Sequence, residues 1–445
     1  MYYQSNWKTV WPPVEGLHIK RKILHGSFKG QELFVPNINV HYAESKDGVH
    51  WEKPNLGLCE FKGSKENNII LKSEDLTKDI AIFDCFVPFI DENPDCSPEK
   101  KYKALVNSFY TLVWFSSPDG IHWTQEDMLN ISGSFDTMDI CWYDKSKKKY
   151  VMYIRDRHER GTPMTVEDIL NSPPKDMEKG IRDIRRTESE DFVHWTQPIP
   201  LTYENTIEDY QLYTNNIRPY YRNENILIGF PTRYTERQEW TENYDELCGK
   251  EERLEKMKTG KRLGLAVMDN IFMNSRDGYH WTRYDEAFFA NERERFDNWI
   301  YGDGYWAYYM LETPSEDGNY KEISMFMPTE YAHGEGKPAY LTRYTLRVDG
   351  FACYTAPAKG AKVVTKPIIF DGTQMKINFS TSAYGNMYIT IADKEGNSVT
   401  SCETFGNTDN RKVNFSKEIL EQFQGKEVVI TFEMKDAKLY SFWFE

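Results

Sequence analysis

Acidic side chains at the starts of short apolar segments are the residues of this sequence that could do chemistry. They are Asp84 in IFDCF, Asp136 and Asp139 in SFDTMDICW, Asp209 in EDYQLYTN, Asp303 in YGDGYW and, one strand further out, Glu330 in KEISMFMPTEY. Two carboxyl groups that flank one bond can cleave it, because a protonated one assists the leaving group while an ionised one acts as base or nucleophile. Each acid taken singly also fits a turn or a cap. The elements that position these acids therefore decide whether they can act together.

Arginines form a second group of candidates. They are Arg155 in YIRDR, Arg185 and Arg186 in IRDIRR, Arg218 in NNIRPYY, and Arg233 with Arg237 in PTRYTER. The guanidinium group makes bidentate contacts with carboxylates and phosphates. A cluster of these side chains would imply an anionic substrate or a reaction that uses inorganic phosphate, whereas ion pairing on strand rims explains each arginine equally well.

The elements that could position these residues come from a repeat. The sequence SKDGVHW at residues 45–51 returns as SPDGIHW, SEDFVHW and SRDGYHW, with its aspartate at positions 47, 119, 191 and 277. The steps are 72, 72 and 86 residues, and a degenerate copy, RVDGF, places Asp349 a further 72 residues on. Five units of this length that carry strands and no helical pattern indicate the blades of a β-propeller. The longer step holds a Glu- and Lys-rich insertion at residues 239–262, which predicts a short helix in a loop.

Each unit predicts several strands. Between residues 83 and 123, the runs FDCFVPFID, KYKALVNSF and TLVWFSSPDGIHWT are rich in β-branched and aromatic residues and are bounded by Pro, Asp, Asn and Gly. The repeated motif would close an outer hairpin, since Ser and Asp can bond to turn backbone, Gly permits positive φ and Trp can pack between sheets. A copy on every blade indicates architecture rather than metal binding by the His-Trp pairs. Acids near the starts of the inner strands would converge on a central funnel.

The pattern changes after the fifth unit. From about residue 356, KVVTKPIIF, QMKINFSTS, GNMYITIAD and KEVVITFEM alternate apolar and polar residues between Gly and Asn turns, which is typical of a small antiparallel sandwich. We therefore predict an all-β chain, with a five-bladed β-propeller over residues 1–355 and a β-sandwich over residues 356–445. Because Met1 stands at the second strand of its unit, we expect the first blade to lack its inner strand.

Composition limits the classes of partner. The chain has 55 Lys and Arg against 69 Asp and Glu, a net charge of −14, which argues against a nucleic-acid partner. Aromatic residues make up 15% of the chain, and such side chains can stack on sugar rings as well as pack between blades. No apolar run reaches the roughly 18 residues of a membrane span, and GxGxxG, Walker and HExxH motifs are absent from the sequence. The seven scattered cysteines, without C-x-x-C spacing, favour a reduced, cytoplasmic protein. The alternative is a secreted protein whose signal sequence lies upstream of Met1.

The repeated turn resembles the Asp-box turns of sialidase-like propellers, with one residue fewer inside the box. With five copies, the whole chain is similar to the five-bladed propeller glycosidases, a broad group of arabinanases, xylosidases and fructosidases. It is most similar to a subgroup that shares GFPTRY, SRDG, NWxYGD and a terminal KDAxLYSF. The resemblance implies a glycoside hydrolase that acts on an oligo- or polysaccharide fragment, an anionic one if the arginines face the funnel. A non-catalytic carbohydrate-binding propeller and a glycoside phosphorylase are the alternatives.

The resemblance also suggests roles, because the acids of arabinanase-like families come from separate blades. Asp209 would be the base or nucleophile, with Glu330 or Asp303 as the acid. Asp136 would hold the substrate. Further substrate contacts are predicted for Arg155, Arg233, Arg237, Tyr213, Trp299, Tyr301 and Asp84. Carbohydrate is the expected partner, and no nucleic acid, membrane, resident metal or cofactor is expected. A structural Ca²⁺ in the funnel is the alternative to a metal-free site.

Overall fold

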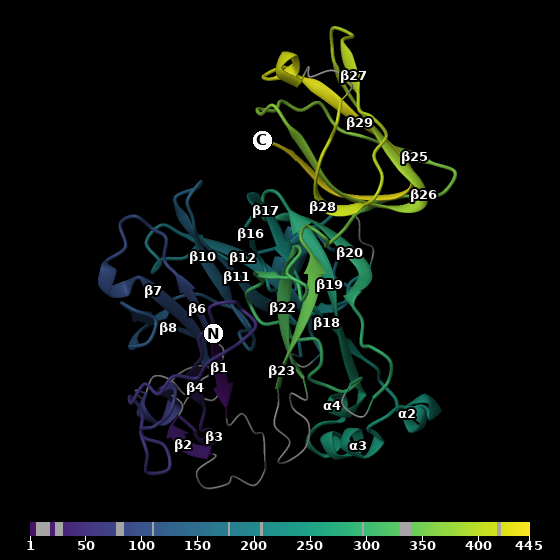
Figure 1. Ribbon diagram of the computed structural model, residues 1–445. Coiled ribbons are helices and arrows are strands. Elements are labelled where there is room, and N and C mark those ends of the chain that lie inside the picture. Colours follow the sequence, from purple (N-terminus) through teal and green to yellow (C-terminus); the bar gives the residue numbers. More distant parts are fainter. Residues whose placement is uncertain are drawn as a thin grey trace. The chain divides into compact units, whose positions relative to one another are not determined.

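The structure is a computed structural model that describes residues 1–5, 18–22, 30–76, 84–108, 111–176, 179–204, 208–295, 298–329, 340–415 and 420–445. The chain divides into two compact units (Figure 1), one of Met1–Met310 with Met325–Arg343 and one of Leu311–Ser324 with Tyr344–Glu445. Strands make up most of the regular structure and helices are few, which confirms the prediction of an all-β chain. The boundary at residues 355 and 356, the number of blades and the sandwich stay predictions.

Four sheets, antiparallel except for one parallel pair, follow one another along the first unit (Figure 1). The first sheet has the order β1 (Tyr2–Ser5), β4 (Asn39–Tyr42) and β5 (Ile69–Lys72), and a separate hairpin joins β2 (His18–Lys22) to β3 (Glu32–Pro36). The second sheet comprises β6 (Asp84–Ile90), β7 (Tyr102–Ser108), β8 (Thr111–Ser117) and β9 (Thr124–Leu129). The third comprises β10 (Ile140–Asp144), β11 (Lys149–His158), β12 (Ile181–Ser189) and β13 (Ile199–Pro200). The fourth runs from β16 (Arg218–Tyr220) through β17 (Asn223–Gly229), β19 (Ala266–Ser275) and β20 (His280–Phe289) to β14 (Thr202–Tyr203). In the same sheet, β18 (Thr232–Glu236) pairs with both β19 and β15 (Gln211–Leu212).

Two further sheets and a few short helices complete the described structure. One sheet has the order β21 (Leu311–Pro314), β22 (Lys321–Thr329) and β23 (Tyr340–Arg347). The other is built on β26 (Met375–Asp393) and β29 (Val428–Phe444), and it includes β24 (Tyr354–Ala356), β25 (Ala361–Val364), β27 (Ser398–Thr400) and β28 (Asn407–Lys412). The helices are α1 (Val166–Asn171), α2 (Glu242–Glu246), α3 (Lys250–Thr259) and α4 (Lys261–Leu265), with the single 3-10 turns η1 (Ser73–Asp75), η2 (Pro98–Lys100) and η3 (Leu420–Phe423). Helices α2 to α4 confirm the helical insertion predicted between the third and fourth repeats.

The repeated motif forms the same turn four times. In the second copy, the Ser117 hydroxyl accepts a hydrogen bond from the Gly120 amide at 2.8 Å, and the Asp119 carboxylate accepts from two later amides, both at 2.9 Å. The Trp123 indole donates to the Gly120 carbonyl at 2.9 Å. The other three copies repeat these contacts, and in the third copy Phe192 takes the place of glycine at a φ of 69°. The aspartates of the motif are therefore occupied in holding turns.

Apolar clusters join each of the four sheets to the next. Val40 of the first sheet and Phe115 of the second belong to one cluster, and Leu105 of the second and Met152 of the third belong to another. Between the third and fourth sheets, the cluster contains the fully buried Trp281 of the fourth copy of the motif. Each of the first three sheets thus packs through apolar side chains on the sheet that follows it.

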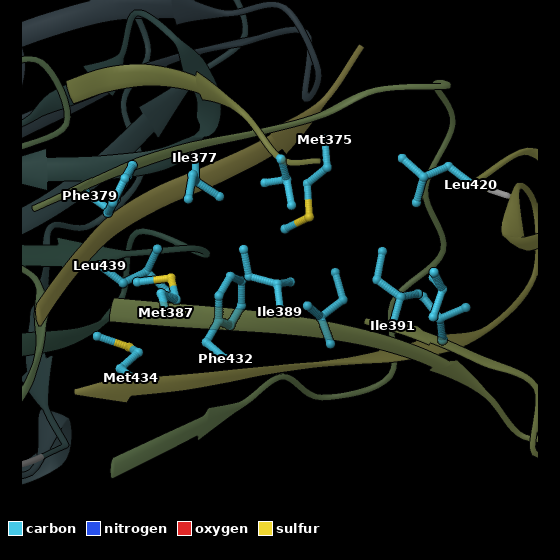
Figure 2. Close-up of a cluster of buried hydrophobic side chains, with 14 of the residues drawn as sticks. Met375, Ile377, Phe379, Met387, Ile389, Ile391, Leu420, Phe432, Met434 and Leu439 are labelled. Atoms are coloured by element: carbon cyan, nitrogen blue, oxygen red, sulfur yellow. The ribbon is translucent and has the colours of Figure 1, made fainter. Parts of the chain in front are cut away.

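The second unit has an apolar core of its own. Figure 2 shows side chains of β26 and β29, among them Ile377, Ile389 and Phe432, gathered between facing strands. Irregular register between Thr381 and Asn386 interrupts the long pairing of β26 with β29. These strands thus bury one continuous cluster, in agreement with the alternation seen in the sequence.

Candidate functional site

The candidate site lies at the first strands of the second and third sheets, β6 and β10. Val87 of β6 and Ile140 of β10 share a small apolar cluster with Tyr308, so the two edge strands lie side by side. Asp84 is the first residue of β6, and Asp139 immediately precedes β10. Packing of the edge strands therefore brings together carboxyl groups that are far apart in the sequence.

Three carboxyl groups, those of Asp84, Asp136 and Asp139, are electrostatic neighbours at this point. Asp139 is buried, and its Oδ1 accepts a hydrogen bond from the Arg155 backbone amide at 3.2 Å, while its Oδ2 has no partner among the described residues. Burial raises the pKa of Asp139 well above its usual range, and the charges of Asp136 and Asp84 act in the same direction. The Asp136 side chain, by contrast, is 47% exposed. The group thus combines a buried acid, whose pKa is raised, with an accessible carboxyl.

Alternation along β11 and β12 places a pair of arginines on one face of the third sheet. The register pairs Arg157 with Arg182, so Arg155 and Arg182 share a face, and both side chains are almost fully buried. Their guanidinium groups lie 5.6 and 5.0 Å from the centre of the Tyr213 ring, which stacks on Tyr234 at 5.6 Å. We call the following five residues the arginine–tyrosine cluster: Arg155, Arg182, Tyr213, Tyr234 and Tyr301.

Hydrogen bonds tie this cluster to the carboxyl groups. The Nη1 of Arg155 donates to Oδ2 of Asp136 at 2.8 Å. The Nη1 of Arg182 donates to Oε1 of Gln211, which lies at the start of β15. The cluster and the three carboxyl groups therefore form one continuous polar site, with Asp136 as an accessible member.

A second network lies at the end of β11, on the other face of the same sheet. The imidazole of the buried His158 is 2.8 Å from Oδ2 of Asp183 through Nδ1 and 3.2 Å from Oδ2 of Asp209 through Nε2. Burial by itself would lower the pKa of His158, but the hydrogen bonds to Asp183 and Asp209 raise it to about 9. His158 is therefore an imidazolium at neutral pH, and it donates to both carboxylates.

Of the two other predicted acids, the structure describes Asp303. Oδ2 of Asp303 accepts a hydrogen bond from the Ile300 amide at 2.9 Å and closes a tight turn. The negative charge of Asp303 also favours a higher pKa for Arg253 and for Lys256, both on α3. Glu330 lies outside the described residues.

Two of the predicted substrate-binding arginines also point elsewhere. Arg233 donates to both oxygens of Asp269, at 2.8 and 2.5 Å, so its guanidinium fork is already occupied. Arg237 is exposed beyond the end of β18. The indole of Trp299 donates to the Glu292 carbonyl at 2.7 Å, in the loop before the Asp303 turn. Of the predicted site residues, the structure brings together Asp84, Asp136, Arg155, Tyr213 and Tyr301, and it places Asp209 at the adjoining strand end.

Sequence reasoning missed Arg182 and His158. Arg182 is the second residue of IRDIRR, where alternate residues of a strand share a face, so parity with Arg186 was the available signal. His158 follows the arginines and aspartate of YIRDR, and histidine is the side chain whose charge a neighbouring carboxylate readily changes near neutral pH. Its two partners, Asp183 and Asp209, come from different elements, which no local pattern reveals.

Within the described residues, no group of three or more His, Cys, Asp or Glu side chains is arranged to hold a metal ion. No helix in the described part of the chain is long and apolar enough to cross a membrane.

Several solved structures are similar to this chain over most of its length. An N-acetylgalactosamine deacetylase from F. plautii in complex with blood group B trisaccharide is 10% identical, with a TM-score of 0.34, and the match covers 92% of this chain and 91% of that chain. A fructofuranosidase from Schwanniomyces occidentalis complexed with fructose is 11% identical, with a TM-score of 0.31 and coverage of 92% and 88%. A glycoside hydrolase family 43 arabinoxylan arabinofuranohydrolase from Bacillus subtilis in complex with cellotetraose is 8% identical, with a TM-score of 0.28 and coverage of 96% and 78%. Neither a family model nor a curated protein matches the sequence. At these TM-scores, function has to be argued from the site itself.

Proposed function

We propose that this protein is a glycoside hydrolase whose sheets form a five-bladed β-propeller followed by a β-sandwich. One observation carries the proposal: Asp84, at the start of β6, and Asp136, in the segment before β10, lie around the buried Asp139 and beside a cluster of tyrosines and arginines. Carboxyl groups held in contrasting surroundings are the arrangement that acid–base cleavage of a glycosidic bond requires. The serial packing of the first four sheets supports the propeller, and the separate core of the second unit supports the sandwich.

Asp136 is the proposed base or nucleophile. Arg155 holds one of its oxygens, and the half-exposed side chain leaves the other oxygen free to meet a water molecule or a sugar carbon. Asp84 is the proposed second carboxyl group, and the buried Asp139 is the neighbour of both. The rings of Tyr213 and Tyr301, whose hydroxyls are 3.4 Å apart, would pack against the sugar.

Asp209 is proposed to support this pair rather than to belong to it. Asp136 contacts Arg155 and Asp209 contacts His158, three residues further along β11, which corresponds to roughly 10 Å along a strand. Arg155 and His158 also have opposite parity, so the two carboxyl groups approach β11 from different faces. Asp209 is therefore kept outside the carboxyl pair and is assigned to stabilising the charged His158 at the end of β11.

The test is hydrolysis of a panel of aryl glycosides and oligosaccharides by the wild type and by Asp136→Asn and Asp84→Asn. Each substitution should reduce kcat by about 10²- to 10⁴-fold, the usual contribution of a general acid or base. The matched control is Asp127→Asn, which changes an exposed aspartate of β9 and should leave kcat unchanged. Turnover that survives both substitutions would refute the assignment. Tight sugar binding without turnover in the wild type would instead indicate a carbohydrate-binding propeller.

A further inference from the structure

The arginine–tyrosine cluster carries more positive charge than its protein neighbours balance. Arg155 is paired with Asp136 at 2.8 Å. Arg182 donates to the neutral Gln211, and Nη1 of Arg262 lies 3.4 Å from the Tyr234 hydroxyl. Over the part of the chain that the structure describes, neither Arg182 nor Arg262 has a carboxylate within 4.0 Å.

Two guanidinium nitrogens of the cluster also lack an acceptor. The Nη2 of Arg155 and the Nε of Arg182 are buried and make no hydrogen bond within the described residues. A buried donor without a partner is costly, and a buried charge without a partner is more costly still, so such groups are normally satisfied by a ligand, an ion or water. Burial lowers the pKa of Arg182, and repulsion by Arg155 and Arg262 acts in the same direction. A bound negative group would relieve all of these costs at once.

The tyrosines of the cluster suit the same ligand. Burial raises the pKa of Tyr213 well above its usual range, so its hydroxyl stays protonated and can donate to an oxygen. The Tyr301 hydroxyl, 3.4 Å away, supplies a second donor. The Arg182 guanidinium lies over both Tyr213 and Tyr234, at 5.0 and 4.8 Å from their ring centres, which fixes its plane and orients its remaining nitrogens.

We propose that the arginine–tyrosine cluster, with Arg262, binds an oxyanion, and that the substrate supplies it as the carboxylate of an acidic sugar. This inference rests on the proposed function, because Asp136 joins the oxyanion site to the carboxyl pair. Arginine forks match a planar carboxylate in two parallel hydrogen bonds, and the neighbouring rings would receive the sugar face. Inorganic phosphate offers the same oxyanion chemistry from solution, and the experiment separates the two sources.

Isothermal titration on the full chain provides the test, with D-galacturonate and D-glucuronate as acidic probes, D-galactose and D-glucose as neutral ones, and inorganic phosphate as the free anion. The wild type is compared with Arg182→Met and Arg262→Gln. The exposed Arg276→Gln is the matched control, because it removes the same charge without touching the cluster. Arg262 is only partly buried, so its substitution keeps the test decisive even if Arg182→Met fails to fold.

An acidic sugar should bind at least tenfold more tightly than its neutral counterpart. Loss of one charge-assisted contact in either variant should weaken that binding by about ten- to a hundredfold, and the control should match the wild type. Equal affinity for acidic and neutral sugars, or unchanged affinity in Arg262→Gln, would overturn the oxyanion site. Phosphate binding without any preference for acidic sugars would overturn the sugar carboxylate as its source.

The outcomes also separate this inference from the proposed function. If aryl glycosides are cleaved in an Asp136-dependent way but acidic sugars bind no better than neutral ones, the hydrolase stands and the oxyanion site fails. If acidic sugars bind in an Arg262-dependent way but no glycoside is cleaved, the site stands and hydrolysis fails.

Discussion

Replacement of His158 by glutamine should remove a pH-dependent part of the stability of the first unit. The folded pKa of His158 is about 9, against an ordinary value of about 6.5, because Asp183 and Asp209 stabilise the imidazolium. A difference of about 2.5 pKa units corresponds to about 3 kcal/mol of unfolding free energy. Since the side chain is only 1% exposed, solvent screening does little to reduce this figure. The folded pKa is raised, so the contribution is complete below about pH 6.5 and disappears as the pH rises to about 9.

The assay is urea unfolding at several pH values between 6 and 9.5, followed by tryptophan fluorescence. Eleven of the 12 tryptophans lie before Leu311, so the signal reports chiefly on the first unit. The wild type should lose about 3 kcal/mol more than His158→Gln over this range. His194→Gln, which changes an exposed histidine of a repeated turn, should keep the wild-type slope. Identical slopes in the wild type and His158→Gln, or a wild-type stability that increases with pH across this range, would refute the reasoning.

Three further changes test the packing. Gly278→Ala should cost about 2–5 kcal/mol of unfolding free energy, because a φ of 84° strains any side chain and the new Cβ would lie 2.5 Å from the Tyr153 hydroxyl. The control Gly161→Ala, at a φ of 83° in open space, should cost only about 1–2 kcal/mol. Equal urea midpoints for the two variants would contradict the packing argument. Trp281→Ala should cost about 3–5 kcal/mol in the same assay, because its side chain is fully buried between the third and fourth sheets, and a loss below 1 kcal/mol would count against that contact. Phe432→Ala should destabilise the second unit by about 3–5 kcal/mol, while kcat on a cleaved glycoside stays unchanged. Hydrogen exchange should increase in β26 and β29. An equal increase in the first unit would show that the two units unfold together.

Local sequence patterns predicted much of the secondary structure. The strands and the repeated turns depend on neighbouring residues alone: alternation defines a strand, and a serine, an aspartate and a residue at positive φ define the turn. Phe192 shows the limit of such rules, since it adopts the conformation that glycine has in the other copies. Its ring lies 5.1 Å from those of Trp114 and Tyr150, and this tertiary packing accompanies a conformation that a phenylalanine rarely adopts.

The all-β class, the repeat and the supply of acids and arginines follow from composition and short-range periodicity, so the sequence predicts them. Which of these side chains meet depends on the packing of the sheets. Arg233 and Arg155 have similar local contexts, yet Arg233 is taken up by Asp269 of the neighbouring strand, while Arg155 turns toward Asp136 and Tyr213. Partners of this kind come from separate strands and sheets. Their proximity depends on how the sheets pack, and no spacing along the chain encodes that distance directly.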